Sequence, residues 1–246
     1  MSLRTSAKLG DRSRLDFWRR HVGALPSVDP TKPSAQGTAT MTSRGCHAHA
    51  PHETPMSGAD GASMPVDSAP VQPVVLVLAS GRGERFWASG GGTHKLQAQL
   101  GSRSVLEHTL DAVRASGLPW HLEQAAHPGM GDSIAAAAGA TRDATGWLIL
   151  PADLPLVRPA TLRAVARALQ EHAVVVPVVQ GRRGHPVGFS AACGPALRAL
   201  AGPQGAAVVI RAHAAFLLAV DDIGCVTDID TLADLEAAQR LLEQRA

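Results

Sequence analysis

Residues 74–86 read VVLVLASGRGERF, and this stretch decides the fold. Its first six residues (74–79) form an unbroken apolar run, which is typical of a strand buried on both faces of a parallel sheet. Small residues and two glycines follow at once, and such a turn lets backbone N–H groups close around phosphate oxygens. The stretch therefore predicts the first strand of an α/β sheet with an anion-binding turn at its carboxyl end.

Strand and helix patterns alternate along the chain after this turn. Apolar runs predict further strands over 147–150, 173–179 and 216–220. Helices are expected over about 104–115, 131–140 and 159–172, with a last helix after Thr231. Alternation at these lengths predicts an α/β protein with a mostly parallel central sheet, covered on both faces, that binds ligands at the carboxyl ends of its strands.

Polar residues mark where these helices begin. Two helices open with capping boxes, Ser104-x-x-Glu107 and Thr231-x-x-Asp234. The helix over 131–140 is expected to be capped by Asp132 or Ser133.

Composition excludes several classes of protein. The 246 residues carry 23 Lys and Arg against 21 Asp and Glu, and 3% are aromatic with no Tyr, which argues against a nucleic-acid-binding surface. No stretch approaches the roughly 18 apolar residues of a membrane-spanning helix, and the N-terminus lacks the apolar core of a signal peptide. The three cysteines, at 46, 193 and 225, form no C-x-x-C pair. We therefore expect a cytoplasmic protein with neither nucleic-acid nor membrane partners.

Residues 1–72 differ from the rest of the chain. They are rich in Ser, Thr, Pro, Gly and His without periodicity, and bury too little apolar surface to offset the entropy of ordering them. We predict a disordered low-complexity tail over 1–72 and a folded domain over 73–246. Four side chains of the tail could bind a metal, but their spacing matches no structural zinc pattern: Cys46, His47, His49 and His52.

The turn after the first strand matches neither of two common phosphate motifs. Phe86 stands where the G-x-G-x-x-G dinucleotide fingerprint needs its third glycine. A Walker A loop is excluded because no G-K-[ST] occurs and Lys95 follows His94. Lys95 is the only lysine of residues 73–246. Together with Arg85 it would place two cations beside a set of backbone donors, as a polyphosphate site requires.

The same residues resemble a family signature. The series Leu78-Ala79-Ser80-Gly81-x-Gly83-x-Arg85-Phe86…Lys95-Leu96 is similar to the L-A-[AG]-G-x-x-x-R-[MF]…K-L signature of the MobA-like NTP transferases. Four further segments match in order: GMGDS at 129–133, LPADLP at 150–155, GHP at 184–186 and DIDTLAD at 228–234. The chain most resembles the molybdenum cofactor cytidylyltransferases. This resemblance implies a three-layer Rossmann-like nucleotidyltransferase fold.

The resemblance also suggests a metal site. In the family, the aspartate of the L-x-D-x-P motif, here Asp153, binds Mg²⁺, and the end of a central strand beside a phosphate loop suits a cation that prefers oxygen ligands. Asp228 and Asp230 occupy alternate positions of an extended segment, so only one is expected to face the metal. The family motif favours Asp230, with Asp228 as the alternative. Both could instead only stabilise the last helix through its dipole, and Asp234 is assigned to the cap.

Nucleotide-binding residues follow from the resemblance as well. They are Leu78, Ala79, Ser80, Gly81, Gly83 and Ser133, the last of which would lie along the base and ribose. His185 is the candidate for the second substrate, because the neighbouring Arg182 and Arg183 would suit an anion.

The reaction that the resemblance implies is transfer of CMP from CTP to a molybdopterin-type cofactor, with release of pyrophosphate. Arg85, Lys95 and Asp153 are the expected catalytic residues. The two cations would hold the leaving pyrophosphate and Asp153 would hold Mg²⁺, while the acceptor phosphate attacks the α-phosphorus in line. The resemblance further suggests the acceptor molybdoenzyme, or its chaperone, as a protein partner.

Several alternatives stay open. At the position of Ser80 the family has Ala in cytidylyltransferases and Gly in guanylyltransferases. A side chain there would crowd a purine, which favours CTP over GTP. The alternatives are a guanylyltransferase for the same cofactor, a nucleotidyltransferase for another small phosphorylated substrate, and a catalytically impaired nucleotide-binding protein. Three departures from the family pattern favour the last: the lengthened segment 87–94, the short segment between Ser116 and Gly129, and a missing acidic residue in 202–205.

Overall fold

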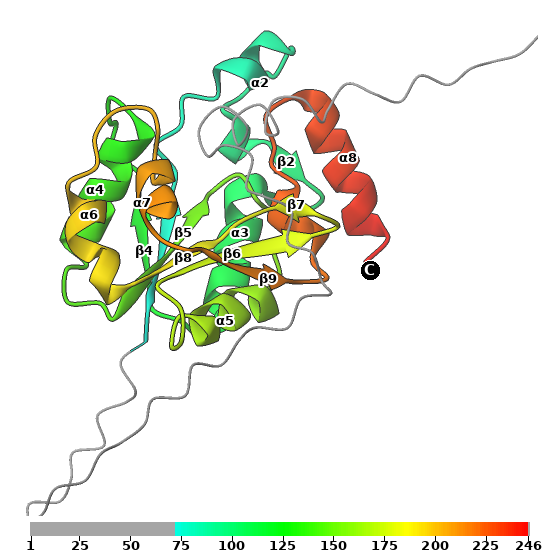
Figure 1. The fold of residues 1–246 in the computed structure, drawn as a ribbon. Coiled ribbons are helices and arrows are strands. Elements are labelled where there is room, and N and C mark those ends of the chain that lie inside the picture. The colour runs from blue at the N-terminus through cyan, green and yellow to red at the C-terminus, as the bar shows by residue number, and fades with distance from the viewer. Residues whose placement is uncertain (1–71, 246) are drawn as a thin grey trace, which may run out of the picture. The chain divides into compact units, whose positions relative to one another are not determined.

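The computed structural model describes residues 72–245. Within them, the main sheet has the strand order β4-β1-β5-β8-β6-β7, with β9 paired to β6 (Figure 1). The strands are β1 (Val74–Leu78), β4 (Trp120–Glu123), β5 (Gly146–Pro151), β6 (Val174–Val179), β7 (Arg182–Arg183), β8 (Val187–Ser190) and β9 (Phe216–Ala219). β1 lies parallel to β4 and β5, and β6 lies parallel to β9, whereas β8 runs antiparallel between β5 and β6. The predicted α/β fold with a mostly parallel sheet is confirmed.

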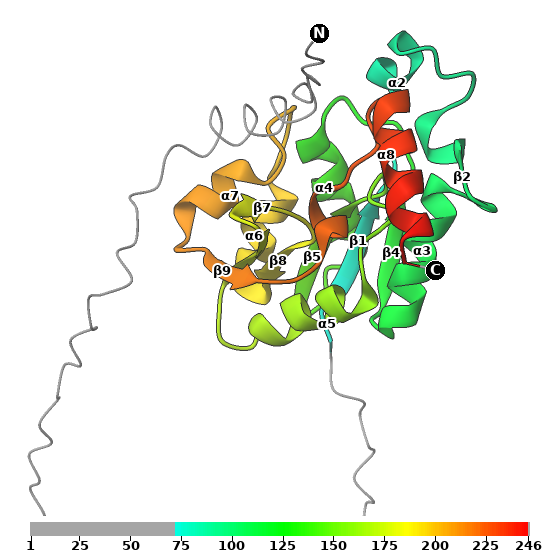
Figure 2. The ribbon, with the colours of Figure 1, turned by 90° about the vertical axis from the view of Figure 1, so that its right-hand side faces the viewer.

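Helices lie on both sides of this sheet (Figure 2). They are α2 (Glu84–Ala88), α3 (Val105–Ser116), α4 (Met130–Ala140), α5 (Pro159–Ala168), α6 (Gly194–Arg198), α7 (Ala207–Ala212) and α8 (Leu232–Glu243). Three 3₁₀ turns, η1 (Lys95–Gln97), η2 (Ala191–Cys193) and η3 (Ile223–Val226), and a small ribbon of β2 (Gln99–Leu100) and β3 (Arg103–Ser104) complete the described elements.

Two hydrophobic cores hold these layers together. Along β1, Val75 and Val77 face the core shared with α3, α5 and α8, whereas Leu76 and Leu78 face the core shared with α4, α6 and α7. This alternation is the period of a strand. Because both faces of β1 are buried, all its positions are apolar, which explains the continuous run in the sequence.

The sequence patterns missed three strands of the main sheet, and also the two strands of the small β2–β3 ribbon. β4 and β7 are short edge strands with polar residues, and Trp120 of β4 is 40% exposed. β4 also shows that the short segment before Gly129 does contain a strand. β8 lies inside the sheet, but Gly188 interrupts its apolar pattern. A Cβ at Gly188 would lie 2.7 Å from a methyl carbon of Val165 in α5, so close packing of helix on sheet requires glycine there.

Two helix predictions need correction. α5 ends at Ala168 and not near His172, because the N–H groups of Gln170 and Glu171 donate to carbonyls three residues back, which tightens the last turn. The N-cap of α4 is Gly129, and no side chain caps it. Asp132 instead accepts a hydrogen bond from the Gly202 N–H at 2.8 Å. Its side chain therefore joins α4 to the segment between α6 and α7 and does not cap α4.

Both predicted capping boxes are confirmed. The Glu107 N–H donates to Ser104 Oγ at 3.3 Å, and the Asp234 N–H donates to Thr231 Oγ1 at 3.2 Å, each with the reciprocal bond present. The predicted tail over 1–72, with its Cys and His residues, lies outside the described residues except for Gln72. Among residues 72–245, no helix has the length and apolarity needed to cross a membrane.

We predict that Gly224→Ala destabilises the protein severely. A Cβ at this position would overlap the backbone carbonyl of Leu156, which cannot move as a flexible side chain could. We expect a loss of about 3 kcal/mol in the free energy of unfolding. Gly139→Ala is the matched control, because nothing lies within 4 Å of its added Cβ and α4 should gain up to about 1 kcal/mol. Equal unfolding midpoints for the two variants in urea would contradict the prediction.

Candidate functional site

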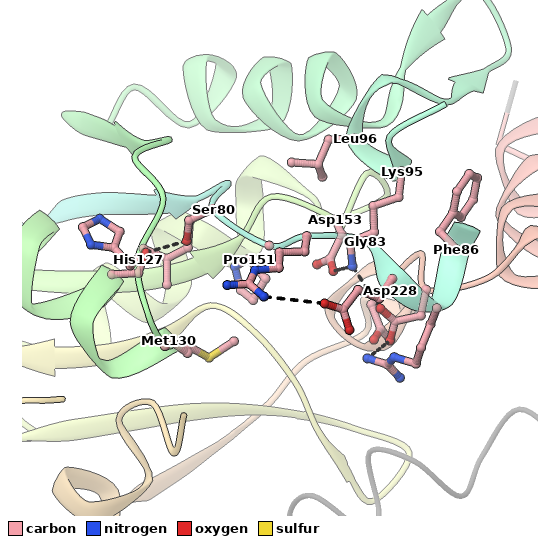
Figure 3. A pocket seen from close by; sticks show the side chains of 18 of the residues that line it. Ser80, Gly83, Phe86, Lys95, Leu96, His127, Met130, Pro151, Asp153 and Asp228 are labelled. Atoms are coloured by element: carbon pink, nitrogen blue, oxygen red, sulfur yellow. Dashed lines mark hydrogen bonds and ion pairs between the residues drawn. The ribbon is translucent and has the colours of Figure 1, made fainter. Parts of the chain in front are cut away.

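A cavity of about 670 Å³ opens at the carboxyl ends of β1 and β5 (Figure 3). This is the edge at which a parallel sheet binds ligands. Its wall contains every predicted site residue except Ala79: Leu78, Ser80, Gly81, Gly83, Arg85, Lys95, Ser133, Asp153, His185 and Asp230. Ala79 packs against the core instead, and its N–H donates to the Glu123 carbonyl at 2.8 Å.

The turn between β1 and α2 exposes backbone to the cavity. We call residues 80–83 the glycine loop. Gly83 has a φ of 67°, in the left-handed region that favours glycine. Nothing lies within 4 Å of a Cβ placed on Gly81, so the loop surface there is open. Arg82 and Glu84 also line the cavity, although their side chains are mostly exposed and lie 3.8 Å apart, Nη1 to Oε1. The open surface at Gly81 lets the loop present its amide groups to an anion.

Lys95 lies between two carboxylates on the cavity wall. Its ammonium donates to Asp153 Oδ2 at 2.7 Å (Figure 3) and to Asp230 Oδ1 at 2.9 Å. Arg85 Nη2 lies 2.8 Å from the other oxygen of Asp230. Lys95 is only 9% exposed, whereas the Arg85 side chain is 63% exposed. Two cations and two carboxylates thus form one compact charged cluster.

Besides Arg85, which lies in α2, three separate parts of the fold deliver this cluster. Asp153 follows β5, the neighbour of β1 in the sheet, and Lys95 begins the η1 turn. Asp230 precedes α8, and its N–H donates to Asp234 Oδ2 at 3.2 Å. The capping box of α8 therefore also fixes the backbone at Asp230.

The charge of Lys95 is stabilised by its partners. Burial opposes the charged form and is the largest single influence. The attraction and hydrogen bonds of Asp153 and Asp230 together outweigh it, so the pKa of Lys95 is raised above its ordinary value of 10.5. Lys95 is therefore a cation at neutral pH although it is buried.

The lengthened segment 87–94 does not carry Lys95 away from the cavity. Ser89 Oγ donates to the Phe86 carbonyl at 2.8 Å and accepts from the Leu232 N–H of α8 at 3.1 Å. The segment is thus tied to α8 next to Asp230. The length of segment 87–94 therefore does not prevent Lys95 from lining the cavity, and it is no longer an argument that catalysis is impaired.

Asp228 and Asp230 both line the cavity, whereas their alternate positions on an extended segment led us to expect only one of them to face the metal. Residues 227–230 form an irregular connection between η3 and α8, so the alternation of a strand does not apply to them. Asp230, favoured in the sequence, is the residue that contacts Lys95 and Arg85.

The carboxylates fit a single hard cation. Asp153 Oδ2 and Asp230 Oδ1 already converge on one nitrogen, and Asp153 Oδ1 is buried without a hydrogen-bond partner among the described residues. Residues 72–245 hold no group of three or more His, Cys, Asp and Glu arranged for a metal. Mg²⁺ suits such a pair, because it takes one or two carboxylates and completes its shell with waters and substrate phosphates.

The far end of the cavity is built from hydroxyls and an imidazole. Ser80 Oγ lies 2.9 Å from Ser133 Oγ (Figure 3). Ser133 lies inside α4, four residues after the N-cap Gly129, and therefore cannot cap the helix. His127, which sequence reasoning missed, also lines the cavity, and its Nε2 lies 3.2 Å from Glu123 Oε1. Burial works against ionisation of Glu123, but the Ala125 N–H and His127 outweigh it and lower the pKa of Glu123. Only the position of His127 shortly before the Gly129 motif could have indicated it.

His185 reaches the cavity wall, whereas Arg182 and Arg183 do not belong to it. The His185 N–H donates to the Cys225 carbonyl at 2.9 Å, which fixes its backbone against η3. The two arginines form β7 at the edge of the sheet. The expectation that they assist His185 with an anionic second substrate is therefore not supported by their placement.

We predict that Lys95→Met lowers the free energy of unfolding by about 2–3 kcal/mol at about pH 8, because it leaves two carboxylates facing each other. The folded-state pKa of Lys95 is raised. The charge of Lys95 therefore contributes its full stabilisation when the pH is below the ordinary pKa of 10.5. This stabilisation is lost as the pH rises through the pKa of Lys95 in the folded protein. Chemical denaturation of both proteins at about pH 8 and about pH 11.5 measures this. A difference that stays constant across this range would contradict the prediction.

Part of the chain is similar to known nucleotidyltransferases. Residues 111–216 match the MobA-like NTP transferase domain. Over 143 residues the chain is 35% identical to a 2-C-methyl-D-erythritol 4-phosphate cytidylyltransferase of Frankia casuarinae, a match that covers 49% of this chain and 52% of the relative. The matched region thus spans about half the length of that curated relative.

Solved structures extend the likeness to the whole described fold. Rv0371c of Mycobacterium tuberculosis is 26% identical with a TM-score of 0.59, over 69% of this chain and 98% of that one. A molybdopterin-guanine dinucleotide biosynthesis protein A of Archaeoglobus fulgidus, 17% identical, has a TM-score of 0.52 over 70% of this chain and 99% of its own. The chain has the fold of these neighbours, and its residues 111–216 match the MobA-like NTP transferase domain.

Proposed function

We propose that this protein is a Mg²⁺-dependent nucleotidyltransferase that transfers CMP from CTP to a phosphorylated acceptor and releases pyrophosphate. One observation carries the proposal: the cluster of Lys95, Arg85, Asp153 and Asp230 lines the same cavity as the glycine loop. Backbone donors, two cations and two carboxylates are the groups that a triphosphate and its metal ion require. The match to the MobA-like NTP transferase domain supports the same chemistry.

Each group has a role in such a transfer. The amides of the glycine loop and the side chains of Arg85 and Lys95 would hold the β- and γ-phosphates, which leave as pyrophosphate. Asp153 and Asp230 would hold Mg²⁺, which when bound supplies positive charge to the phosphates. An oxygen of the acceptor's phosphate attacks the α-phosphorus while the bond from that phosphorus to the β-phosphate oxygen breaks. No covalent intermediate on the protein is required.

The proposed donor is CTP. Ser80 carries a side chain where a purine-selective site would have glycine, and its bond to Ser133 holds that side chain in place at 2.9 Å. The relative that is 35% identical over half its length bears the name of a cytidylyltransferase.

The proposed acceptor is a molybdopterin-type cofactor, as the signature residues suggest. A second candidate is a polyol phosphate, because that relative is named for 2-C-methyl-D-erythritol 4-phosphate. Both compounds offer a phosphate monoester as the attacking group, so the catalytic roles above are the same for either acceptor.

Release of pyrophosphate tests the donor and the acceptor together. We expect turnover with CTP and Mg²⁺ to exceed turnover with GTP or ATP by at least about tenfold, since Ser80 narrows the base site against a purine. UTP, a pyrimidine of the same size, is assayed as well. Each nucleotide is assayed with molybdopterin cofactor and with the polyol phosphate. A preference for GTP would move the assignment to a guanylyltransferase, and no release with any pair would overturn the proposed reaction.

We predict that Asp153→Asn abolishes Mg²⁺-dependent turnover and leaves the fold intact. Asn is nearly isosteric but brings no negative charge to the ion, so the rate should fall at least about a hundredfold. Asp143→Asn serves as the matched control, because Asp143 is exposed and does not line the cavity. Circular dichroism checks the fold of both variants. Turnover of Asp153→Asn close to that of the control would remove Asp153 from the metal site.

A further inference from the structure

We propose that His94 is a positioning residue, which holds the glycine loop and Lys95 in a fixed relation to each other. This inference rests on the proposed function, because it concerns how the same site binds a nucleoside triphosphate. Both ring nitrogens of His94 have backbone partners: Nε2 lies 2.8 Å from the Gly81 carbonyl oxygen, and Nδ1 accepts from the Leu96 N–H at 3.3 Å.

These two contacts require one form of the ring. A carbonyl oxygen can only accept, so Nε2 must carry the hydrogen that it donates to Gly81. The Leu96 N–H can only donate, so Nδ1 must offer its lone pair. The neutral Nε2–H imidazole satisfies both partners at once. The ring thus connects the backbone of its own turn to a backbone carbonyl 13 residues before His94.

The connected segments are those that carry the phosphate-binding groups. His94 is the N-cap of η1, the turn that begins with Lys95. Gly81 lies in the glycine loop, and Gly83 packs directly against the connector. A Cβ added to Gly83 would lie 3.5 Å from Lys95 Cγ and 3.6 Å from His94 Nε2. The loop and the lysine are therefore held at contact distance through His94.

The bond to Gly81 also sets the direction of a peptide group. A trans peptide is planar, with its C=O and the following N–H on opposite edges. Since the Gly81 carbonyl points to His94, the Arg82 N–H faces away from the ring. A carbonyl left to turn toward a phosphate would repel it, whereas this arrangement keeps that carbonyl engaged elsewhere.

The long segment before Lys95 explains why such a tie is needed. Between the Arg85–Asp230 ion pair and Lys95 the chain makes an excursion held by Ser89, whose Oγ accepts from the Leu232 N–H at 3.1 Å. His94 is the last anchor before Lys95. Without it, no hydrogen bond among residues 72–245 would join the glycine loop to the turn that begins with Lys95.

Two substitutions separate the contacts. Asn at position 94 keeps a short acceptor that can cap η1, but it is too short to cap the turn and reach Gly81 as well. His94→Ala loses both contacts. We expect His94→Asn to raise the Kd for CTP with Mg²⁺ about tenfold in calorimetric titrations, and His94→Ala to raise it at least as much.

His108→Asn is the matched control. His108 Nε2 makes the same kind of contact, 2.7 Å from the Leu100 carbonyl, but it does not line the cavity. This variant should keep the wild-type Kd for CTP. A second readout needs no nucleotide: amide hydrogen exchange of the peptide over 79–84 should be faster in both His94 variants and unchanged in His108→Asn.

The outcomes distinguish this inference from the proposed function. If CTP affinity and loop exchange of His94→Asn both equal those of the control, the positioning role is overturned. If the wild-type protein binds none of CTP, GTP, ATP and UTP, the proposed function fails. In that case, faster loop exchange in His94→Asn than in His108→Asn would still support the role of His94 in holding the loop.

Discussion

The ammonium of Lys95, held at 2.7 Å from Asp153 and 2.9 Å from Asp230, is the interaction on which the site depends. A buried amine of this kind is stable only because two carboxylates meet it, and the carboxylates tolerate each other only because a cation lies between them. The same arrangement brings together the groups that a triphosphate and Mg²⁺ would use. The atoms that balance the buried charge, the Lys95 ammonium and the two carboxylates, are thus also the atoms assigned to the proposed chemistry.

The fold supplies this balance from distant parts of the chain. β1 and β5 are neighbours, so the glycine loop and Asp153 emerge at the same edge of the sheet. The capping box of α8 fixes Asp230, and His94 fixes the turn that begins with Lys95. The first support is strand pairing, and the other two are backbone contacts made by side chains outside the charged cluster. The geometry is therefore set by the fold and not by the charges alone.

Patterns among neighbouring residues were enough to predict much of the fold. The apolar run of β1, the two capping boxes and the order of the motifs depend on neighbouring residues, and the structure agrees with them. What sequence reasoning missed depends on distant contacts. β8 is hidden by Gly188, which α5 requires, and the roles of His94 and His127 exist only because Gly81 and Glu123 lie beside them. Asp228 was misplaced because an irregular segment was treated as a strand.

A crystal structure with Mn²⁺ and a non-hydrolysable CTP analogue is the most direct test of the roles proposed for this site, because anomalous scattering locates the metal without assumptions about its ligands. We expect manganese bound by Asp153 and Asp230, the triphosphate on the glycine loop, and the Lys95 ammonium in contact with a phosphate oxygen. Manganese at other residues, or a triphosphate bound away from residues 80–83, would contradict these roles.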